Sequence, residues 1–237
     1  MSEYRAKDYL VGLFDEMART YGFVHLVASL GFAYFWRRAC VRRLDGIEGR
    51  VCDLMAGGGE CVRHLKRRLG RSVSVDLFDF SSVMCERARA TIRRAGYEDC
   101  RAIHADVLEM EDGAGTYDAV VSTFGVKTLG EDDLRRLAAT VHRLLKPGGR
   151  YSLLELSVPG NPLVRAPFRF YVAHVVPWIG RLALGNPENY AMLWKYTAAF
   201  GDCTKLAAAF REAGLTVVYE RHVWGCATQV SGEKPAA

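Results

Sequence analysis

The sequence lacks any apolar stretch long enough to cross a bilayer. Such a span needs about 18 to 20 consecutive apolar residues. The two most apolar stretches, 23–36 and 170–184, are interrupted by His25, His174, Pro177 and Arg181. The first thirty residues also lack the apolar core of a secretory signal peptide, because charged residues recur among them. We therefore expect a protein that is not exported and is either soluble or attached peripherally to a membrane.

Paired cysteines and blocks of one charge are missing as well. The seven cysteines form no Cys-x-x-Cys pair, and their odd number argues against a disulfide framework, so a reducing cytoplasm fits best. The net charge is +5, but basic and acidic residues are interspersed, so no nucleic-acid partner is expected. No repeat or low-complexity stretch divides the 237 residues, which predicts a single domain.

What the sequence does have is a glycine turn after a short apolar run. Val51–Leu54 is followed by Gly57, Gly58 and Gly59, and contains the acid Asp53. Asp79 stands twenty residues past Gly59 and closes a second apolar run, 73–78. An acid at this distance from a glycine turn is typical of a carboxylate that binds a ribose. The pattern therefore predicts a nucleoside ligand.

The surrounding residues narrow the choice of ligand. A dinucleotide site would have a third glycine where this chain has Val62, and a triphosphate site would have Gly-Lys-Ser or Gly-Lys-Thr at the helix start. The carboxylates of Asp53, Glu60 and Asp79 instead favour a cation such as S-adenosylmethionine. A glycine-rich turn with no ligand is the alternative, and the spacing of Asp79 counts against it.

Strand and helix patterns alternate along the chain, which predicts an α/β fold with a doubly wound, Rossmann-like parallel sheet. In such sheets the ligand binds at the carboxyl ends of the strands. Asp53, Asp79, Asp106 and Ser122 all fall at such ends. The expected strands are Val51–Leu54, 73–78, 102–105, 119–122 and 151–156, and the expected helices between them are 59–69, 81–95 and 131–145.

Further segments flank this core of residues 50–157. An N-terminal helical region covers residues 1–45, with the helical pattern itself at 6–44, and a closing helix with a hairpin covers 201–230. Residues 158–200 are rich in proline and aromatic residues and predict a helical, apolar cap inserted after the fifth strand. An ordinary helical insertion packed on the sheet is the alternative.

Several motifs resemble a known family in order along nearly the whole chain. The glycine turn is similar to motif I of class I S-adenosylmethionine-dependent methyltransferases, and the series as a whole resembles the C-methyltransferases of ubiquinone and menaquinone synthesis. The matching strings are Leu13-Phe14-Asp15-Glu16-Met17-Ala18, Phe35-Trp36-Arg37-Arg38, Asp79-Phe80-Ser81, Leu145-Lys146-Pro147-Gly148-Gly149, Leu153-Leu154-Glu155-Leu156-Ser157 and Val176-Pro177-Trp178-Ile179-Gly180.

The resemblance implies a role for each residue of the cofactor site. It places Asp79 and Phe80 at the ribose, and Asp106 and Val107 at the adenine. It places Gly57, Gly58, Gly59 and Thr123 around the methionine part, with Asp53 directed to its ammonium group.

Two segments depart from the family pattern at the substrate side. Where the family has Tyr-Asp-x-x-Asn, this chain has Tyr21-Gly22-Phe23-Val24-His25. Where it has Phe-Gly-Leu-Arg-Asn, this chain has Phe124-Gly125-Val126-Lys127-Thr128. These changes resemble the rhodoquinone-biosynthesis branch, which implies that a ring methoxy group of ubiquinone is replaced by an amino group. The branch also implies S-adenosylmethionine as the amino donor and manganese as an assisting metal, although no metal-ligand spacing identifies its ligands.

The amino exchange suggests roles for four residues. Lys127 is expected to polarise the quinone oxygen, while Tyr21, His25 and Thr128 position the substrate or relay protons. A solvated loop lysine and a structural histidine are the alternatives. Two other functions stay open: C-methylation of a demethylated ubiquinol or menaquinol, and a non-catalytic subunit that binds S-adenosylmethionine.

The substrate implied by the resemblance is a polyprenylated quinone, which resides in the bilayer. Aromatic residues stand next to basic ones in the segment Phe32-Ala33-Tyr34-Phe35-Trp36-Arg37-Arg38, with Arg42 and Arg43 close behind. Such a mixture suits an anionic membrane surface, and a core-facing helix is the alternative. The expected location is cytoplasmic, peripheral on the inner face of the cytoplasmic membrane.

Overall fold

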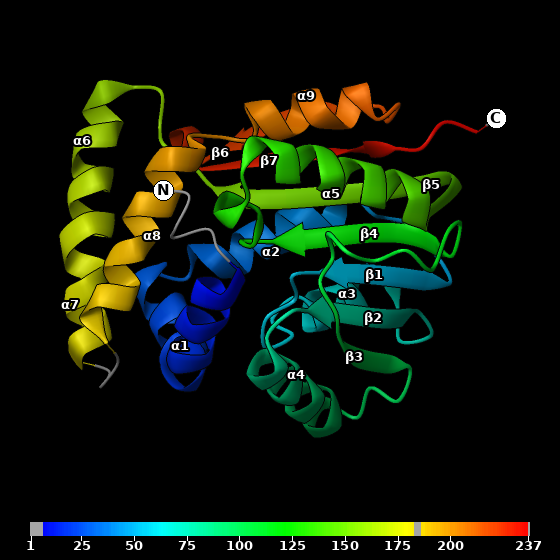
Figure 1. Ribbon diagram of the computed structural model, residues 1–237, viewed down its shortest axis with the longest axis horizontal. Helices are drawn as coiled ribbons and strands as arrows, with labels where there is room; N and C mark the ends of the chain where they lie inside the picture. Colours follow the sequence, from blue (N-terminus) through cyan, green and yellow to red (C-terminus); the bar gives the residue numbers. More distant parts are fainter. Residues whose placement is uncertain (1–6, 183–185, 237) are drawn as a thin grey trace.

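A mixed seven-stranded sheet forms the centre of the protein (Figure 1). The computed structural model describes residues 7–182 and 186–236, and the side chains of residues 18–26 lie outside that description. The strand order is β3-β2-β1-β4-β5-β7-β6, and β7 is the strand that pairs antiparallel with both of its neighbours. The strands are β1 Arg50–Leu54, β2 Ser74–Asp79, β3 Cys100–His104, β4 Tyr117–Thr123, β5 Leu145–Leu156, β6 Val218–His222 and β7 Ala227–Glu233.

The strand order confirms the predicted α/β sheet. The first five strands run parallel to one another, so their carboxyl ends share one edge of the sheet. The central strands are apolar without alternation because both of their faces are covered. β5 begins at Leu145, earlier than the expected residue 151, because Leu145 pairs with Tyr117 before the register shifts around Lys146-Pro147-Gly148-Gly149.

Helices cover both faces of the sheet. Helices α5 (Glu131–Leu144) and α9 (Thr204–Glu212) bury Leu137, Val141 and Phe210 against one face. Helices α2 (Phe32–Arg42), α3 (Val62–Leu69) and α4 (Ser82–Ala95) pack against the other. The result is a three-layer arrangement in which the carboxyl edge of the sheet stays available for a site.

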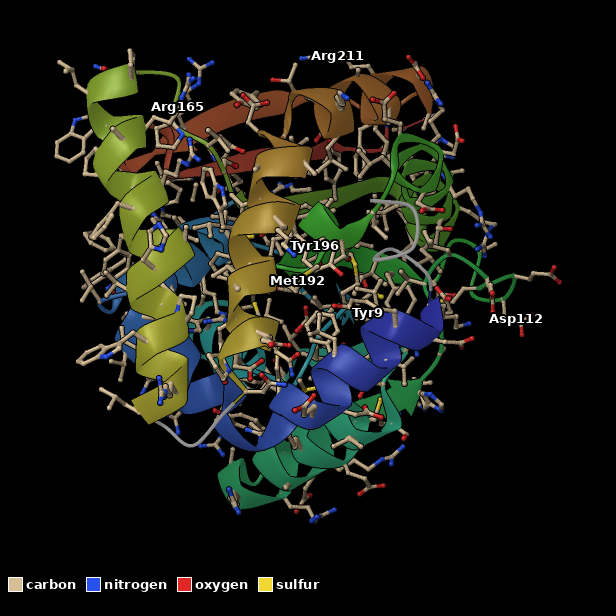
Figure 2. The ribbon with its side chains drawn as sticks, turned by 60° about the vertical axis from the view of Figure 1, so that its left-hand side comes forward. Tyr9, Asp112, Arg165, Met192, Tyr196 and Arg211 are labelled. Carbon is tan, nitrogen blue, oxygen red and sulfur yellow. The ribbon has the colours of Figure 1, made fainter. Side chains whose placement is uncertain are left out.

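A group of helices closes that edge. It consists of α1 (Lys7–Ala28) and the helices that follow β5, which are α6 (Pro162–Phe170), a π-helical turn (Tyr171–Val175), α7 (Val176–Leu182) and α8 (Pro187–Phe200). They share an apolar cluster that includes Leu10 and Leu13 of α1, Val176 of α7 and Tyr190 of α8. Figure 2 shows α8, with Met192 and Tyr196, between α6 and α1. The helical cap expected after the fifth strand is therefore present, and α1 belongs to the same group.

The N-terminal helical region is divided into two helices. The sequence pattern predicted helical structure from residue 6 to residue 44, whereas the structure breaks it at Leu30 and Gly31, whose φ angles are 50° and 78°. Glycine adopts this left-handed conformation at little cost, and an interruption there lets α2 turn back onto the sheet. None of the described helices is long and apolar enough to cross a membrane.

Candidate active site

The turn after β1 brings the backbone close to the carboxyl edge of the sheet. Gly57 and Gly59 have φ angles of 55° and 79°, and a Cβ atom on Gly59 would lie 3.2 Å from Leu77 Cδ2. Gly59 therefore allows close packing of the turn on β2. Met55 and Phe124 adopt φ angles of 55° and 67° although neither is glycine. Such strained residues concentrate at functional sites, and these two follow β1 and β4 at the same edge.

Asp79 ends β2 and is tied to the glycine turn. Its Oδ2 accepts a hydrogen bond of 2.8 Å from the N–H of Gly57, and its Oδ1 accepts one of 3.0 Å from the N–H of Ser81. Burial raises the pKa of Asp79, and these two backbone donors oppose the increase. The carboxylate is thus fixed in place with lone pairs left for the hydroxyl groups of a ribose.

Asp106 lies just beyond β3 and is covered by the first turn of α1. Its Oδ1 accepts a hydrogen bond of 2.9 Å from the N–H of Leu108, and its Oδ2 lies 2.9 Å from Lys7 Nζ. Lys7 also contacts Glu109, and the two carboxylates together raise the pKa of Lys7. The helix α1 therefore spans the site and is anchored at the position expected for the adenine.

Charged side chains gather behind the glycine turn. Asp53 is almost completely buried, and its Oδ2 has no hydrogen-bond partner among the described residues. Burial raises the pKa of Asp53 to about 8, nearby Glu60 adds to the increase, and Arg37 opposes it. A buried carboxylate oxygen without a donor fits a ligand that brings a positive charge, as the ammonium group of S-adenosylmethionine would.

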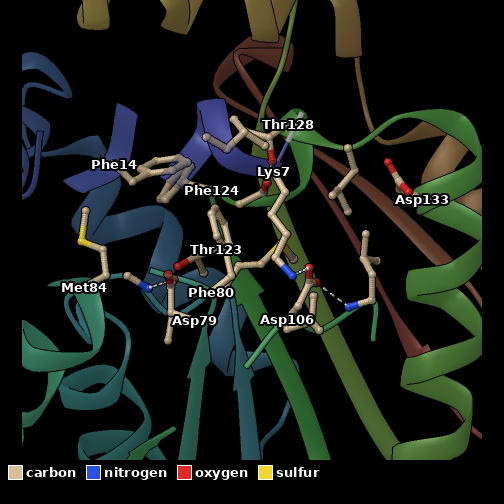
Figure 3. A pocket seen from close by; sticks show the side chains of 18 of the residues that line it. Lys7, Phe14, Asp79, Phe80, Met84, Asp106, Thr123, Phe124, Thr128 and Asp133 are labelled. Atoms are coloured by element: carbon tan, nitrogen blue, oxygen red, sulfur yellow. Dashed lines mark hydrogen bonds and ion pairs between the residues drawn. The ribbon is translucent and has the colours of Figure 1, made fainter. Parts of the chain in front are cut away.

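A cavity of about 110 Å³ connects these elements. Figure 3 shows Asp79 and Asp106 at its floor, Lys7 and Phe14 of α1 above, and Thr123 and Phe124 beside them. Of the residues expected to bind the cofactor, six line the cavity: Gly57, Asp79, Phe80, Asp106, Val107 and Thr123. Asp53, Gly58 and Gly59 are not among its described lining residues.

Arg37 is a cavity residue that the sequence analysis assigned to a membrane surface instead. Its side chain is buried, and the guanidinium lies 5.0 Å from the centre of the Phe124 ring. It lines the cavity together with Gly57 and Glu60. A buried arginine at this position suits the carboxylate of the methionine part, because a guanidinium binds carboxylates in a bidentate manner.

A second, apolar cavity of about 240 Å³ lies under the cap. Its walls come from α1, α2, α6, the π-helical turn, α7 and α8, with side chains such as Met17, Phe168 and Met192. Phe14, Phe124 and Thr128 line both cavities. The two spaces therefore meet at these three residues, which is where a group could pass from a cofactor to an apolar substrate.

Lys127 lines the apolar cavity and belongs to a buried ion pair. Its Nζ lies 3.1 Å from Glu155 Oε1 and donates a second hydrogen bond to the carbonyl of Phe124. Glu155 is fully buried at the end of β5, and it also accepts hydrogen bonds from the N–H groups of Lys127 and Leu156. The sequence analysis quoted Glu155 within a motif but gave it no role. Its signal was that it is the single charged residue of the expected strand 151–156.

The other expected catalytic residues are placed as follows. Thr128 is buried at the junction of the cavities and donates a hydrogen bond of 2.8 Å to the carbonyl of Gly125. Tyr21 and His25 lie in α1, but their side chains are outside the described residues. Ser122, expected at a strand end, is buried, and its neighbour Thr123 lines the cavity instead. Within the described ranges no group of three His, Cys, Asp or Glu side chains is arranged to hold a metal, so manganese has no identified ligands here.

An antiparallel β7 between β5 and β6, together with a cofactor cavity at the carboxyl edge of the sheet, is the architecture of class I S-adenosylmethionine-dependent methyltransferases. Comparison with known proteins identifies the family within this class. The profile of the ubiE/COQ5 methyltransferase family matches residues 3–234, and the chain belongs to that family.

Individual relatives agree with this assignment. The chain is 31% identical over 230 residues to the demethylmenaquinone methyltransferase of Lactiplantibacillus plantarum, with 95% of each protein covered. It is 32% identical over 208 residues to a ubiquinone/menaquinone biosynthesis C-methyltransferase of Desulfotalea psychrophila, covering 87% of this chain and 82% of the relative.

Solved structures support the fold alone. A chain from the complex between the Haloferax volcanii Trm112 methyltransferase activator and its methyltransferase superposes with a TM-score of 0.66 at 17% identity. The match covers 94% of this chain and 97% of the other.

Proposed function

We propose that this protein transfers a group from S-adenosylmethionine to the ring of a polyprenylated quinone. The observation that carries the proposal is the junction of the two cavities at Phe14, Phe124 and Thr128. A nucleoside-binding site on one side and an apolar, aromatic-lined space on the other suit a cationic cofactor and a ring with an isoprenoid tail. When bound, S-adenosylmethionine supplies an electrophilic methyl group on sulfur and an α-amino group.

The first candidate reaction is C-methylation of a demethylated quinol. The names of the relatives support it more directly than the amino exchange that we expected from the sequence. In this reaction the electron-rich ring carbon forms a bond to the methyl carbon while the methyl–sulfur bond breaks. The ring proton then passes to a base, so the substrate cavity must offer one.

The lining of the apolar cavity favours a second candidate, the exchange of a ring methoxy group for an amino group. Among the described lining residues, Lys127 is the charged one, and no carboxylate or histidine accompanies it. A lysine at the ring suits an electrophilic, oxidised quinone better than it suits proton abstraction, because a cation stabilises the charge that develops on the carbonyl oxygen. The changed segment Phe124-Gly125-Val126-Lys127-Thr128 lies at this junction.

The exchange can be written with its atoms balanced. The nitrogen of an amine bonds to the ring carbon that carries the methoxy group, and the electron pair moves onto the quinone oxygen near Lys127. Return of that pair expels methoxide, which takes the proton released by nitrogen and leaves as methanol. Loss of the proton on the donor α-carbon then passes two electrons to the quinone ring and leaves a carbon–nitrogen double bond. Water hydrolyses that bond, which releases the donor as a 2-oxo acid and leaves the amino group on the reduced ring.

Isotope labelling separates the candidates. The purified protein would be incubated with S-adenosylmethionine that carries nitrogen-15 in its amino group and deuterium in its methyl group, with and without manganese. Oxidised short-tailed ubiquinone and a demethylated menaquinol would be offered in parallel. Nitrogen-15 in the product of the oxidised quinone would establish amino exchange, and deuterium in the product of the quinol would establish C-methylation.

A variant and a binding measurement complete the experiment. The Lys127→Met variant should lose turnover in either reaction while it still binds S-adenosylmethionine, because Lys127 lines the substrate cavity and not the cofactor cavity. Binding of S-adenosylmethionine without transfer of either label would contradict both reactions and would support a non-catalytic binding subunit.

A further inference from the structure

The outermost helices of the cap carry an exposed apolar stripe. Helix α6 has no buried residue, and the rod formed by α6, the π-helical turn and α7 lies at the outer edge of the molecule, with Arg165 near one end (Figure 2). Four large side chains on this rod are exposed: Leu163 (83%), Phe170 (63%), Trp178 (60%) and Leu182 (64%). Leu163 and Phe170 are seven residues apart in α6, and Trp178 and Leu182 are four apart in α7, so each pair lies on one side of its own helix. We call these four residues the α6–α7 stripe.

The opposite side of the same rod lines the apolar cavity. Phe168, Tyr171, Val172 and Val176 all contribute to that lining. The rod is therefore apolar on two sides, one facing the cavity and one facing out. An exposed apolar side of this kind marks a protein interface or a membrane contact.

The cavity has exposed lining residues next to this rod. Leu30 lines the cavity although it is 69% exposed, and Phe32 lines it at 41% exposure. The end of α1, just before them, is joined to the rod, because the Tyr171 hydroxyl donates a hydrogen bond of 3.0 Å to the carbonyl of Ala28. The cavity mouth therefore lies beside the helices that carry the α6–α7 stripe.

The charge of the rod identifies the surface it would meet. Residues 157–182 contain Arg165, Arg169 and Arg181 and no aspartate or glutamate. All three arginines are exposed. Exposed aromatic and aliphatic side chains beside arginines match the boundary of an anionic bilayer, where the apolar groups enter the acyl region and the arginines meet lipid phosphates.

We propose that the α6–α7 stripe docks onto an anionic phospholipid bilayer and places the mouth of the apolar cavity at the membrane surface. A lipid-borne tail would then enter the cavity without crossing water. The proposal rests on the proposed function for the identity of that tail. It differs from the surface expected from the sequence on α2, where Trp36 and Arg37 are buried and Arg43 pairs with Glu220, whereas Phe35 and Arg38 are exposed.

Vesicle flotation tests the docking itself. The full-length protein should float with mixed phosphatidylcholine and phosphatidylglycerol vesicles, and less with phosphatidylcholine alone. A Phe170→Ser/Trp178→Ser variant should bind anionic vesicles about tenfold more weakly or worse, because each side chain loses its apolar burial. Arg169→Gln/Arg181→Gln should weaken binding at low salt. Val218→Ser is the matched control: Val218 is 49% exposed on β6, outside the stripe, and this variant should float like the parent.

Three outcomes would overturn the proposal: a parent protein that does not float, a stripe variant that floats as well as the parent, or a parent dimer that the stripe variant converts to a monomer. The last would assign the stripe to a second copy of the chain. Activity separates this proposal from the function. The stripe variant should keep turnover of a water-soluble short-tailed quinone and lose turnover of a long-tailed quinone in vesicles. If no quinone is turned over by the parent, the function fails while flotation still decides the docking.

Discussion

Replacing Lys127 by methionine removes one half of a buried ion pair, and its cost can be worked out from the structure. The side chains of Lys127 and Glu155 are 8% and 0% exposed, and their charged atoms lie 3.1 Å apart. Breaking such a pair from one side costs about 3–5 kcal/mol. Two backbone N–H groups still donate to Glu155 in the variant, so we expect a value of about 3 kcal/mol, at the lower end. At about 2–4 °C per kcal/mol for a chain of this size, Tm should fall by about 6–12 °C.

The assay is urea unfolding followed by circular dichroism, without cofactor. Lys146→Met is the matched control, because Lys146 and Asp118 also form an ion pair, of 2.7 Å, but are 45% and 25% exposed. A pair of that kind contributes only about 0–1 kcal/mol. Lys127→Met/Glu155→Gln should recover part of the loss, since it leaves no unpaired buried charge. If Lys127→Met costs no more than Lys146→Met, the buried pair does not exist in solution, and the reasoning that places a fixed cation at the substrate ring is refuted.

Three further predictions concern the cofactor side. The pKa of Asp53 is about 8 in the folded protein against an ordinary value of 3.8, so its contribution to the free energy of unfolding is full below about pH 4 and is lost as pH rises toward 8. Asp53→Asn should therefore flatten the fall in Tm over this pH range. An unchanged pH profile would contradict the raised pKa. Arg37→Ala should raise the Kd for S-adenosylmethionine by about tenfold or more in calorimetry, and Arg38→Ala, an exposed neighbour, should not. Gly125→Ala should lower the free energy of unfolding by about 1–3 kcal/mol through overpacking, because its Cβ would lie 2.6 Å from Met55 Cβ. Met55→Gly in the same chain removes that Cβ and should restore part of the loss, and no rescue would mean that the two positions do not touch.

The sheet could be predicted from the sequence because its signals are local. Buried strands are short apolar runs, and the helices between them have their own period, so the alternation at 51–156 predicts that the first five strands are parallel. The ends of helices were harder to predict where the local sequence pattern favours a helix but tertiary packing breaks it. The pattern of 6–44 remains helical through Leu30, and the break there depends on how α2 packs on the sheet.

The position of the candidate cofactor site followed from topology once the strands were known. Asp79 and Asp106 had to share an edge, because parallel strands end together, and both line the cavity. Glu155 and Arg37 could not be found in this way. The partner of Glu155 comes from a turn 28 residues earlier in the chain, and the inward direction of Arg37 depends on which side of α2 meets the sheet. The string Phe35-Trp36-Arg37-Arg38 does not indicate which of its two arginines points inward.

The cap helices carry apolar side chains on both their inner and their outer side. In the segment 162–182 apolar residues occur on two sides of the rod, so the sequence does not indicate which of them are buried. The structure divides them: Phe168 and Val172 line the cavity, whereas Phe170 and Trp178 face outward. The inner side chains would contact an apolar substrate such as a prenylated ring, and the outer side chains would contact an apolar surface such as a bilayer. An enzyme whose substrate dissolved in water would need only the inner group, and its cap would then show a helical period with a polar outer side.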